Sequence, residues 1–266
     1  MNVALPALIL QQIHLVKFDP TLIYAVLMPW LQFALSAGFF VVIGRRLALA
    51  PATTGALAKV GGLGNTSFLG LPMIETFYGA SGMPVGILID HLGSYLALST
   101  VGIALISAYG QGAVTRLDIV PRILTFPPMI ALLLAVALVP VGYPAVVSGV
   151  LGRLAGTLAP LALISVGLQL RLAEFGGRRG LIAIGLGYKL VLAPLVIMVV
   201  YAGLIGLRGH AAQVTLFEAA MPPMLGGSIV AIQYGLDAKL ISLMVGLGTV
   251  AAFVTMPAWA SAFAFV

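Results

Sequence analysis

Long apolar stretches alternate with short polar links along the whole chain. Most of the stretches approach the ~20 residues that an α-helix needs to cross the hydrocarbon core of a bilayer. The pattern predicts about nine crossings, in the segments 2–15, 21–43, 52–79, 84–110, 123–141, 145–170, 181–207, 211–234 and 240–265. We therefore expect an all-α polytopic membrane protein that resides in the lipid bilayer.

The segment 52–79 is interrupted near its middle by residues that weaken a helix. The glycines that weaken it are Gly61, Gly62, Gly64 and Gly70. The side chains of Asn65, Thr66 and Ser67 compete with the backbone for hydrogen bonds. We expect a break near 64–67, at mid-depth in the membrane, where an open backbone must face protein or a water-filled cavity.

The segment 211–234 is interrupted in a similar way. Pro222 and Pro223 remove two backbone donors, and Gly226 and Gly227 follow them. Two interrupted segments at corresponding positions of two halves indicate the binding site of a transporter. We expect the two broken helices to cross each other at these breaks.

Composition agrees with a membrane protein and excludes several other classes. Apolar residues make up 61% of the chain and charged residues 8%, with a mean hydropathy of +1.16. The formal net charge of +6 does not indicate a nucleic-acid partner, because no basic cluster is longer than two residues. The chain has 0 cysteines, which excludes disulfides and thiolate metal sites.

The basic residues of the polar links fall mainly on one side of the membrane. That side carries Arg45, Arg46, Arg116, Arg122, Arg171, Arg178, Arg179 and Lys239. The other side has Lys17 and Arg208. Because cytoplasmic loops are enriched in Lys and Arg, we expect the N-terminus and the link 111–122 inside the cell and the C-terminus outside. The expected location is the cell membrane.

The two halves of the chain repeat each other with opposite polarity. The matching pairs are Pro29 with Pro194, Gly38 with Gly203, Gly70 with Gly226 and Tyr78–Gly79 with Tyr234–Gly235. An odd number of crossings separates the matching elements, so they enter the membrane from opposite sides. We divide the chain into a first inverted repeat 1–110, a cytoplasmic link 111–122 and a second inverted repeat 123–266.

Several motifs, taken in order, resemble those of the auxin efflux carrier family. They are NVALPALIL at 2–10, GNTSFLGLP at 64–72, PLALISVG at 160–167, and AAMP at 219–222 with Tyr234–Gly235. The resemblance covers essentially the whole chain. It implies ten helices in two inverted repeats of five, with the fourth and ninth crossing at prolines around the substrate site. The sequence departs from this pattern by lacking the first helix.

The resemblance also implies a function. Members of the family include plant auxin exporters and bacterial carriers of malonate, malate and similar organic acids. We therefore expect a secondary transporter of a small organic anion, working by alternating access. The two broken helices would move against a scaffold that includes the spans with Pro29 and Pro194. A homodimer is left open.

The expected substrate site lies where the broken helices cross. A new helix begins after each break, and its unpaired N–H groups and positive dipole end favour an anion. We favour Asn65 as a donor to the substrate's carboxylate over a purely capping role. Thr66 and Ser67 either join it or bond back to the helix, and Pro222 and Pro223 would keep the opposite backbone open.

Three carboxylates are candidates for coupling transport to Na⁺ or H⁺. We expect Glu75, Asp90 and Glu218 to share the outer half of the protein, where they would carry a proton or hold a cation. The alternative is that Glu75 and Asp90 reach the outer interface and are solvated. Snorkelling or structural pairing is expected for the remaining cations within the spans: Lys59, Arg153 and Lys189. We expect no other cofactor and no metal.

Three other classes of function remain as alternatives. A channel would need a continuous polar lining rather than one break at mid-depth. A membrane enzyme would need a nucleophile with a base, yet the sequence contains no nucleophile elbow, phosphate loop or metalloprotease motif. A non-transporting receptor on the same helical scaffold is the third possibility. The duplicated, broken architecture favours a carrier over all three.

Overall fold

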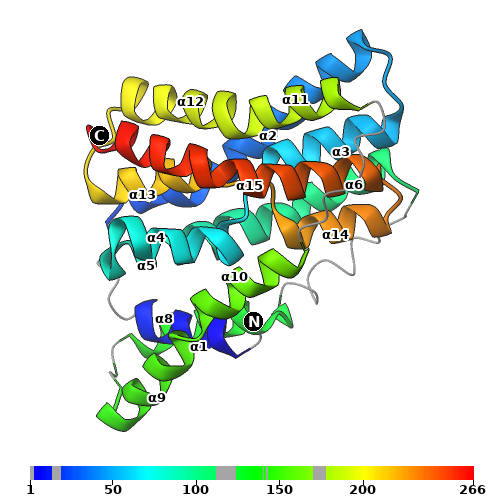
Figure 1. The fold of residues 1–266 in the computed structure, drawn as a ribbon. Coiled ribbons are helices and arrows are strands. Elements are labelled where there is room, and N and C mark those ends of the chain that lie inside the picture. The colour runs from blue at the N-terminus through cyan, green and yellow to red at the C-terminus, as the bar shows by residue number, and fades with distance from the viewer. Residues whose placement is uncertain (1–2, 14–18, 112–123, 140, 142, 170–177) are drawn as a thin grey trace.

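The computed structural model describes residues 3–13, 19–111, 124–139, 141, 143–169 and 178–266. Within these ranges the chain is mainly helical, and the β-pairing among the described residues is one isolated bridge (Figure 1). The prediction of an all-α polytopic fold is confirmed. Most of the predicted link 111–122 lies outside the described residues.

The first half contains one long helix, one broken helix and one long composite helix. In order its main elements are α1 (Ala4–Ile13), α2 (Leu22–Arg46), α3 (Pro51–Gly62), the π-helical η1 (Thr66–Gly70), α4 (Leu71–Tyr78), α5 (Met83–Leu88), the π-helical η3 (Ile89–Tyr95) and η4 (Leu98–Gly102), and α6 (Ile103–Tyr109). Pro51 opens α3, where its missing N–H leaves no intrahelical bond unmade.

The second half repeats the long, broken and long helices after three shorter ones. Its elements are α8 (Pro127–Leu138), α9 (Ala145–Ala155), α10 (Leu158–Gln169), α11 (Arg179–Gly187), the π-helical η6 (Tyr188–Leu192), α12 (Ala193–Met198), the π-helical η7 (Val199–Leu204), α13 (His210–Ala219), α14 (Leu225–Gln233) and α15 (Ala238–Phe263).

Five helical segments of the described chain are long and apolar enough to cross a membrane. They are Leu22–Arg46, Ala80–Tyr109, Ala145–Ile164, Arg179–Leu204 and Ala238–Phe263. The two broken helices and the short apolar helices α1 and α8 correspond to the other segments expected from the sequence.

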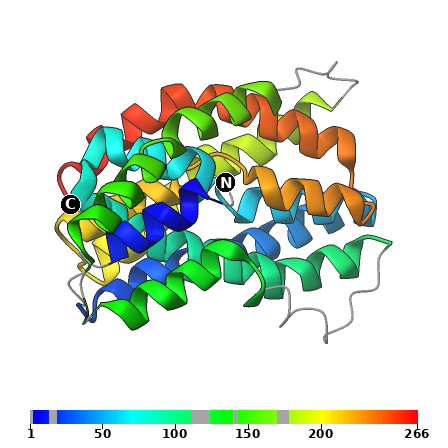
Figure 2. The ribbon, with the colours of Figure 1, turned by 90° about the horizontal axis from the view of Figure 1, so that it is seen from below.

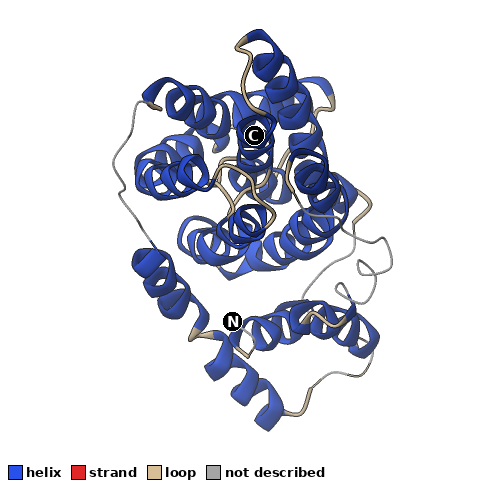
Figure 3. Cartoon of the chain, turned by 90° about the vertical axis from the view of Figure 1, so that its right-hand side faces the viewer, coloured by secondary structure: helices blue, strands red, loops and turns tan. Residues whose placement is uncertain are grey.

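The helices form a larger and a smaller group (Figure 3). In the smaller group, α1 packs against α8 and α9 (Figure 2), and α10 reaches across to η1 and α4. In the larger group, α2 packs along α3, and α12 packs against α13. The expectation that the spans with Pro29 and Pro194 form a scaffold separate from the broken helices is therefore wrong.

Small residues explain why α2 stays with the broken helix. A Cβ on Gly61 would lie 2.6 Å from the Phe40 ring, and one on Gly62 would lie 2.8 Å from the Phe33 ring. The two helices approach so closely that only glycine fits at these positions. Large apolar surfaces are buried along this contact, which favours one packed unit.

The two broken helices run in opposite senses through the larger group. The N–H of Asp237 donates to the Ala52 carbonyl, and the N–H of Gln111 donates to the Tyr234 carbonyl. The start of α3 therefore lies at the same end of the molecule as the end of α14. We call this the arginine-rich end, because Arg45, Arg46, Arg178 and Arg179 lie there; the opposite end, reached by α4, is the distal end.

Candidate functional site

The breaks of the two helices meet inside the larger group. The N–H of Asn65 donates to the Pro222 carbonyl at 2.8 Å, and the N–H of Met224 donates to the Leu63 carbonyl at 2.9 Å. Between these bonds, Gly64 and Pro223 face each other as an antiparallel bridge. The breaks therefore cross, as expected from the matched interruptions.

The two breaks satisfy some of each other's backbone hydrogen-bonding groups. Pro222 and Pro223 are buried, and the Pro222 carbonyl is already used by Asn65. The expectation that these prolines keep the opposite backbone open is correct only in part, because extended segments that cross can pair like short strands. The first break also comes slightly earlier than expected, since Thr66 and Ser67 already belong to η1.

Asn65 has two roles at the crossing. Its Oδ1 accepts from the Phe68 N–H at 3.3 Å and so caps η1. Its Nδ2 is buried without a hydrogen-bond partner, and the residue is only 2% exposed. An amide donor left unpaired inside a protein costs free energy. Capping is thus present, and the amide group remains available to a ligand.

Asp90 lies directly beside the start of η1. The Thr66 hydroxyl donates to Asp90 Oδ1 at 2.5 Å, and His91 Nδ1 lies 3.3 Å from Asp90 Oδ2. The same Nδ1 lies 3.1 Å from the Ile87 carbonyl. Two acceptors around Nδ1 place a proton there and leave Nε2, which is buried without a partner. Asp90 is buried, so the alternative of a solvated Asp90 is wrong.

Glu218 is fully buried at the end of α13. Neither of its carboxylate oxygens has a hydrogen-bond partner, and they occupy the space that a Cβ on Gly70 would need. Asp90 and Lys189 are both close enough to act on Glu218 electrostatically. Two of the three expected coupling residues therefore come together. Glu75 instead is exposed and lines a separate cavity.

Two fully buried lysines flank the crossing. Lys189 Nζ donates to the Ala219 carbonyl at 3.4 Å. Lys59 Nζ donates to Ser228 Oγ at 3.0 Å and to the Met224 carbonyl at 3.3 Å. Of the two expected interpretations, snorkelling is therefore wrong for both lysines, because each ammonium points inward to the break, and their bonds fit structural pairing. Arg153 is exposed on α9, and its snorkelling stays a prediction.

Several of these residues sit on π-helical segments. Thr66 belongs to η1, Asp90 and His91 to η3, and Lys189 to η6. A π-turn widens the helix by one residue and changes the direction of the side chains that it carries, and such turns are frequent at functional sites. Their occurrence next to the crossing explains why ordinary helical spacing does not place these side chains.

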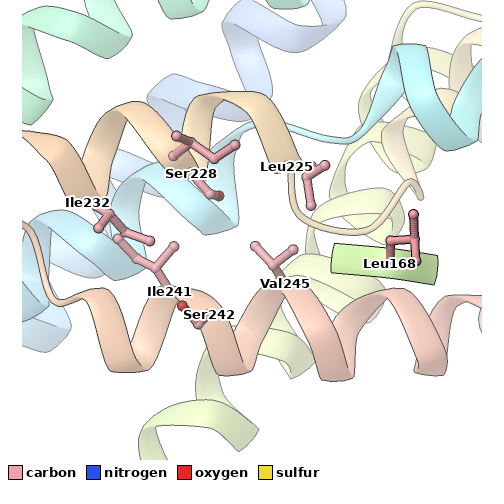
Figure 4. Close-up of a pocket in the computed structure, with 8 residues that line it drawn as sticks. Leu168, Leu225, Ser228, Ile232, Ile241, Ser242 and Val245 are labelled. Atoms are coloured by element: carbon pink, nitrogen blue, oxygen red, sulfur yellow. The ribbon is translucent and has the colours of Figure 1, made fainter. Parts of the chain in front are cut away.

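Two cavities lie on opposite sides of the crossing and share no lining residue. One, of about 270 Å³, lies toward the arginine-rich end between α14 and α15 (Figure 4). The other, of about 250 Å³, lies toward the distal end, between α4 and the smaller helix group. Glu75 lines the second cavity together with Gln11 and Gln12.

Comparisons with known proteins show the family of this chain. Residues 113–260 match the protein family described as "Membrane transport protein". An uncharacterized transporter from Methanothermobacter thermautotrophicus is 30% identical over 264 residues, which cover 97% of this chain and 85% of that protein. The chain belongs to the auxin efflux carrier family.

A second relative of this chain is an uncharacterized transporter from Methanocaldococcus jannaschii. It is 29% identical over 212 residues, which cover 77% of this chain and 67% of that protein. The family and its relatives indicate a multi-pass membrane transporter rather than an enzyme.

Sequence reasoning found part of the candidate site and missed part. Asn65 and Thr66 were expected at the crossing, and the structure places both there. Ser67 is half-buried in η1, beside them in the chain. Lys59 and Lys189 were missed as site residues. One signal existed for Lys59, which lies about one helical turn before the break in α3, a helix that contains no acidic residue to pair with it.

Proposed function

We propose that the chain is a secondary active transporter that moves a small organic anion across the membrane, with its substrate site at the crossing. The observation that carries this proposal is the Nδ2 group of Asn65, buried at the crossing without a partner. A substrate carboxylate would satisfy this donor. An amide binds an anion without a permanent charge, which allows the substrate to leave again.

The charges around the crossing support an anionic substrate. The ammonium groups of Lys59 and Lys189 approach the breaks from two sides, and both are removed from water. Lys59 forms no ion pair with a carboxylate of the described chain, and such a buried cation favours a ligand of opposite charge. Asp90 and Glu218 lie on the Lys189 side, and we propose that they carry the coupling ion, H⁺ or Na⁺.

The arrangement supports a carrier over a channel. The two cavities are separate, and the crossing lies between them. Movement of the larger helix group against α1, α8, α9 and α10 would open the crossing to each side in turn, which is alternating access. Flux that saturates with substrate concentration is the expected behaviour, whereas flux that rises linearly would indicate a channel.

Two variants of Asn65 test the substrate site. Asn65→Asp keeps an oxygen that caps η1 and replaces the free donor with a negative charge, while Asn65→Ala removes both. In proteoliposomes we expect both variants to bind organic anions ~10-fold or more weakly, with a loss of about 1–3 kcal/mol for Asn65→Ala. Thermal unfolding in detergent separates this loss from a folding defect, because Asn65→Asp retains the cap.

Two results would contradict the proposed function. One is wild-type affinity for organic anions in both Asn65 variants. The other is a preference of the wild-type protein for a cationic substrate, with tighter binding by Asn65→Asp.

We also propose that the arginine-rich end faces the cytoplasm. Because the chain has 0 cysteines, single cysteines report topology without background. An impermeant thiol reagent added to intact cells should label Arg208→Cys at the distal end and should not label Arg46→Cys. The reverse pattern would invert the assignment. Position 116, a natural choice in the predicted link, lies outside the described residues.

A further inference from the structure

The cavity on the distal side lies at the joint between the two helix groups (Figure 3). Its walls come mainly from α1, α9 and α10 of the smaller group and from α4 and α5 of the larger group. Any movement of one group against the other therefore changes the shape of this cavity. A ligand that contacts both groups would bind one arrangement better than another and would so act on the movement itself.

The polar side chains of this cavity offer acceptors that the described chain does not satisfy. Gln11 and Gln12 line it from α1, and Glu75 lines it from α4. Gln12 Oε1 is buried without a hydrogen-bond partner, which costs free energy unless a ligand supplies a donor. Among the described residues, no ion pair or hydrogen bond involves the carboxylate of Glu75.

The walls of the cavity supply no cation of their own. None of its lining residues in the described chain is a lysine, an arginine or a histidine. Arg153, which follows the lining residue Gly152 in α9, is exposed and forms no ion pair with Glu75. Gly152 also lets the amide of Gln11 lie against α9, because a Cβ there would be 3.1 Å from Gln11 Nε2. The negative charge of the cavity is thus left for a ligand to compensate.

This set of acceptors suits an organic ammonium better than a metal ion. Protein sites for Ca²⁺ usually combine several carboxylates, and the described residues contain no group of three or more His, Asp or Glu side chains that could hold a metal. A primary ammonium carries one positive charge and three N–H donors, which match one carboxylate and two amide oxygens. Leu8, Leu71 and Met83 also line the cavity of about 250 Å³, and they would surround a short alkyl chain.

We propose that the distal cavity is a regulatory site for small primary amines, in which Glu75, Gln11 and Gln12 bind the ammonium group and tie the two helix groups together. The site is separate from the crossing and shares no lining residue with the cavity on the arginine-rich side. Its effect on transport rests on the proposed function, whereas amine binding itself does not. An amine bound here slows the movement of the groups without competing with the organic anion.

Two cations of equal charge test the chemistry of the site in the purified protein, without substrate. Butylamine should raise the midpoint of thermal unfolding in detergent, because a ligand of the folded state stabilises it. Butyltrimethylammonium has no N–H donor and should bind ~10-fold or more weakly at the same ionic strength. Equal binding of the two cations would overturn the proposal. So would stabilisation by Ca²⁺ or Na⁺ but not by butylamine, which would indicate a metal site.

Two variants locate the binding. Glu75→Gln removes the charge with little change of shape and should weaken butylamine binding ~10-fold or more. Gln12→Leu removes the unpaired acceptor and should weaken it several-fold. Asp19→Asn, which changes an exposed carboxylate, and Gln213→Leu, which changes a half-buried glutamine on α13, lie outside the cavity and serve as matched controls. Wild-type affinity for butylamine in both Glu75→Gln and Gln12→Leu would overturn the site.

Exchange of organic anions in proteoliposomes, measured without a pH gradient, tests the regulatory effect. Butylamine should lower the maximal rate of exchange and leave the half-saturating concentration of the anion unchanged, and Glu75→Gln should remove this inhibition. Binding of butylamine that does not slow exchange, or inhibition that a higher anion concentration relieves, would overturn the regulatory role. If the wild type exchanges no organic anion, the proposed function fails, while the binding experiment still decides whether the amine site exists.

Discussion

The two sides of the crossing handle buried charge in different ways. On the distal side, Lys189 is accompanied by the carboxylates of Glu218 and Asp90. On the arginine-rich side, Lys59 has only a hydroxyl and a carbonyl as partners. The first arrangement compensates charge within the protein, and the second leaves a cation that a ligand can compensate.

This difference suggests a division of labour between the two sides. A group of buried ionisable residues that partly neutralise one another can take up or release an ion with little change of structure. An uncompensated ammonium next to an apolar cavity instead favours an organic anion. In the proposed carrier, the distal side would handle the coupling ion and the arginine-rich side the substrate.

The largest expected effect follows from neutralising the carboxylates. Glu218→Gln and Asp90→Asn should each abolish gradient-driven accumulation of substrate while exchange of substrate across the membrane continues, because exchange needs no coupling ion. Glu75→Gln is the matched control, since Glu75 is exposed in a different cavity. Uptake and exchange are measured in the same proteoliposomes. Normal accumulation by both variants would contradict the proposal that the distal side handles the coupling ion.

The second prediction compares the two lysines by stability. Lys189→Met leaves the carboxylates of the distal side without their cation and should destabilise the protein by about 3–5 kcal/mol. Lys59→Met removes a cation without a carboxylate partner, so its stability should stay equal or rise. Thermal unfolding in detergent measures both. The double variant Lys189→Met/Glu218→Gln should recover much of the lost stability. Equal losses of stability for the two lysine variants would contradict the proposed difference in charge compensation between the two sides.

The third prediction uses two glycines that occupy matching positions in the repeats. A Cβ on Gly70 would collide with the Glu218 carboxylate, whereas a Cβ on Gly226 meets open space. Gly70→Ala should cost about 1–3 kcal/mol by overpacking. Gly226→Ala should be neutral or stabilising by up to about 1 kcal/mol, because alanine favours a helix. Unfolding of the two variants, measured side by side, tests this asymmetry. Equal effects of the two substitutions on stability would contradict it.

The smallest expected effect concerns Asp237, which caps α15 at the arginine-rich end. Burial alone would raise the pKa of Asp237, but hydrogen bonds from Arg178, the Leu240 N–H and Thr53 lower it below the ordinary value of 3.8. Its stabilising contribution is therefore complete above pH 3.8 and is lost as the pH falls through the lowered folded-state pKa.

The substitution Asp237→Ala should lower stability by ~1 kcal/mol at neutral pH. Unfolding of the wild type and the variant should converge as the medium is acidified below the ordinary aspartate range. A difference that persists in acid would show that packing, and not the charge of Asp237, is responsible.

The sequence predicted most of what depends on local composition. Apolar length indicated the bilayer and the crossings, and the residues that disfavour a helix at 64–67 and at 222–223 indicated the two breaks. Matching prolines and glycines indicated the opposed repeats. Asn65 could be placed at the crossing for the same reason, because its position within a broken segment is a local property.

Tertiary packing decided which charges meet and which helices belong together. Nothing in the spacing of Gly70 and Glu218 shows that the carboxylate fills the space beside that glycine, and π-turns redirect Asp90 and Lys189 in ways that ordinary helical periodicity does not describe. The grouping of α2 with the broken helices depends on how closely Gly61 and Gly62 let Phe40 and Phe33 approach. A sequence pattern determines that the chain lies in lipid and where its helices run, because each residue contributes to these properties independently. The position of a buried charge instead depends on several helices at once.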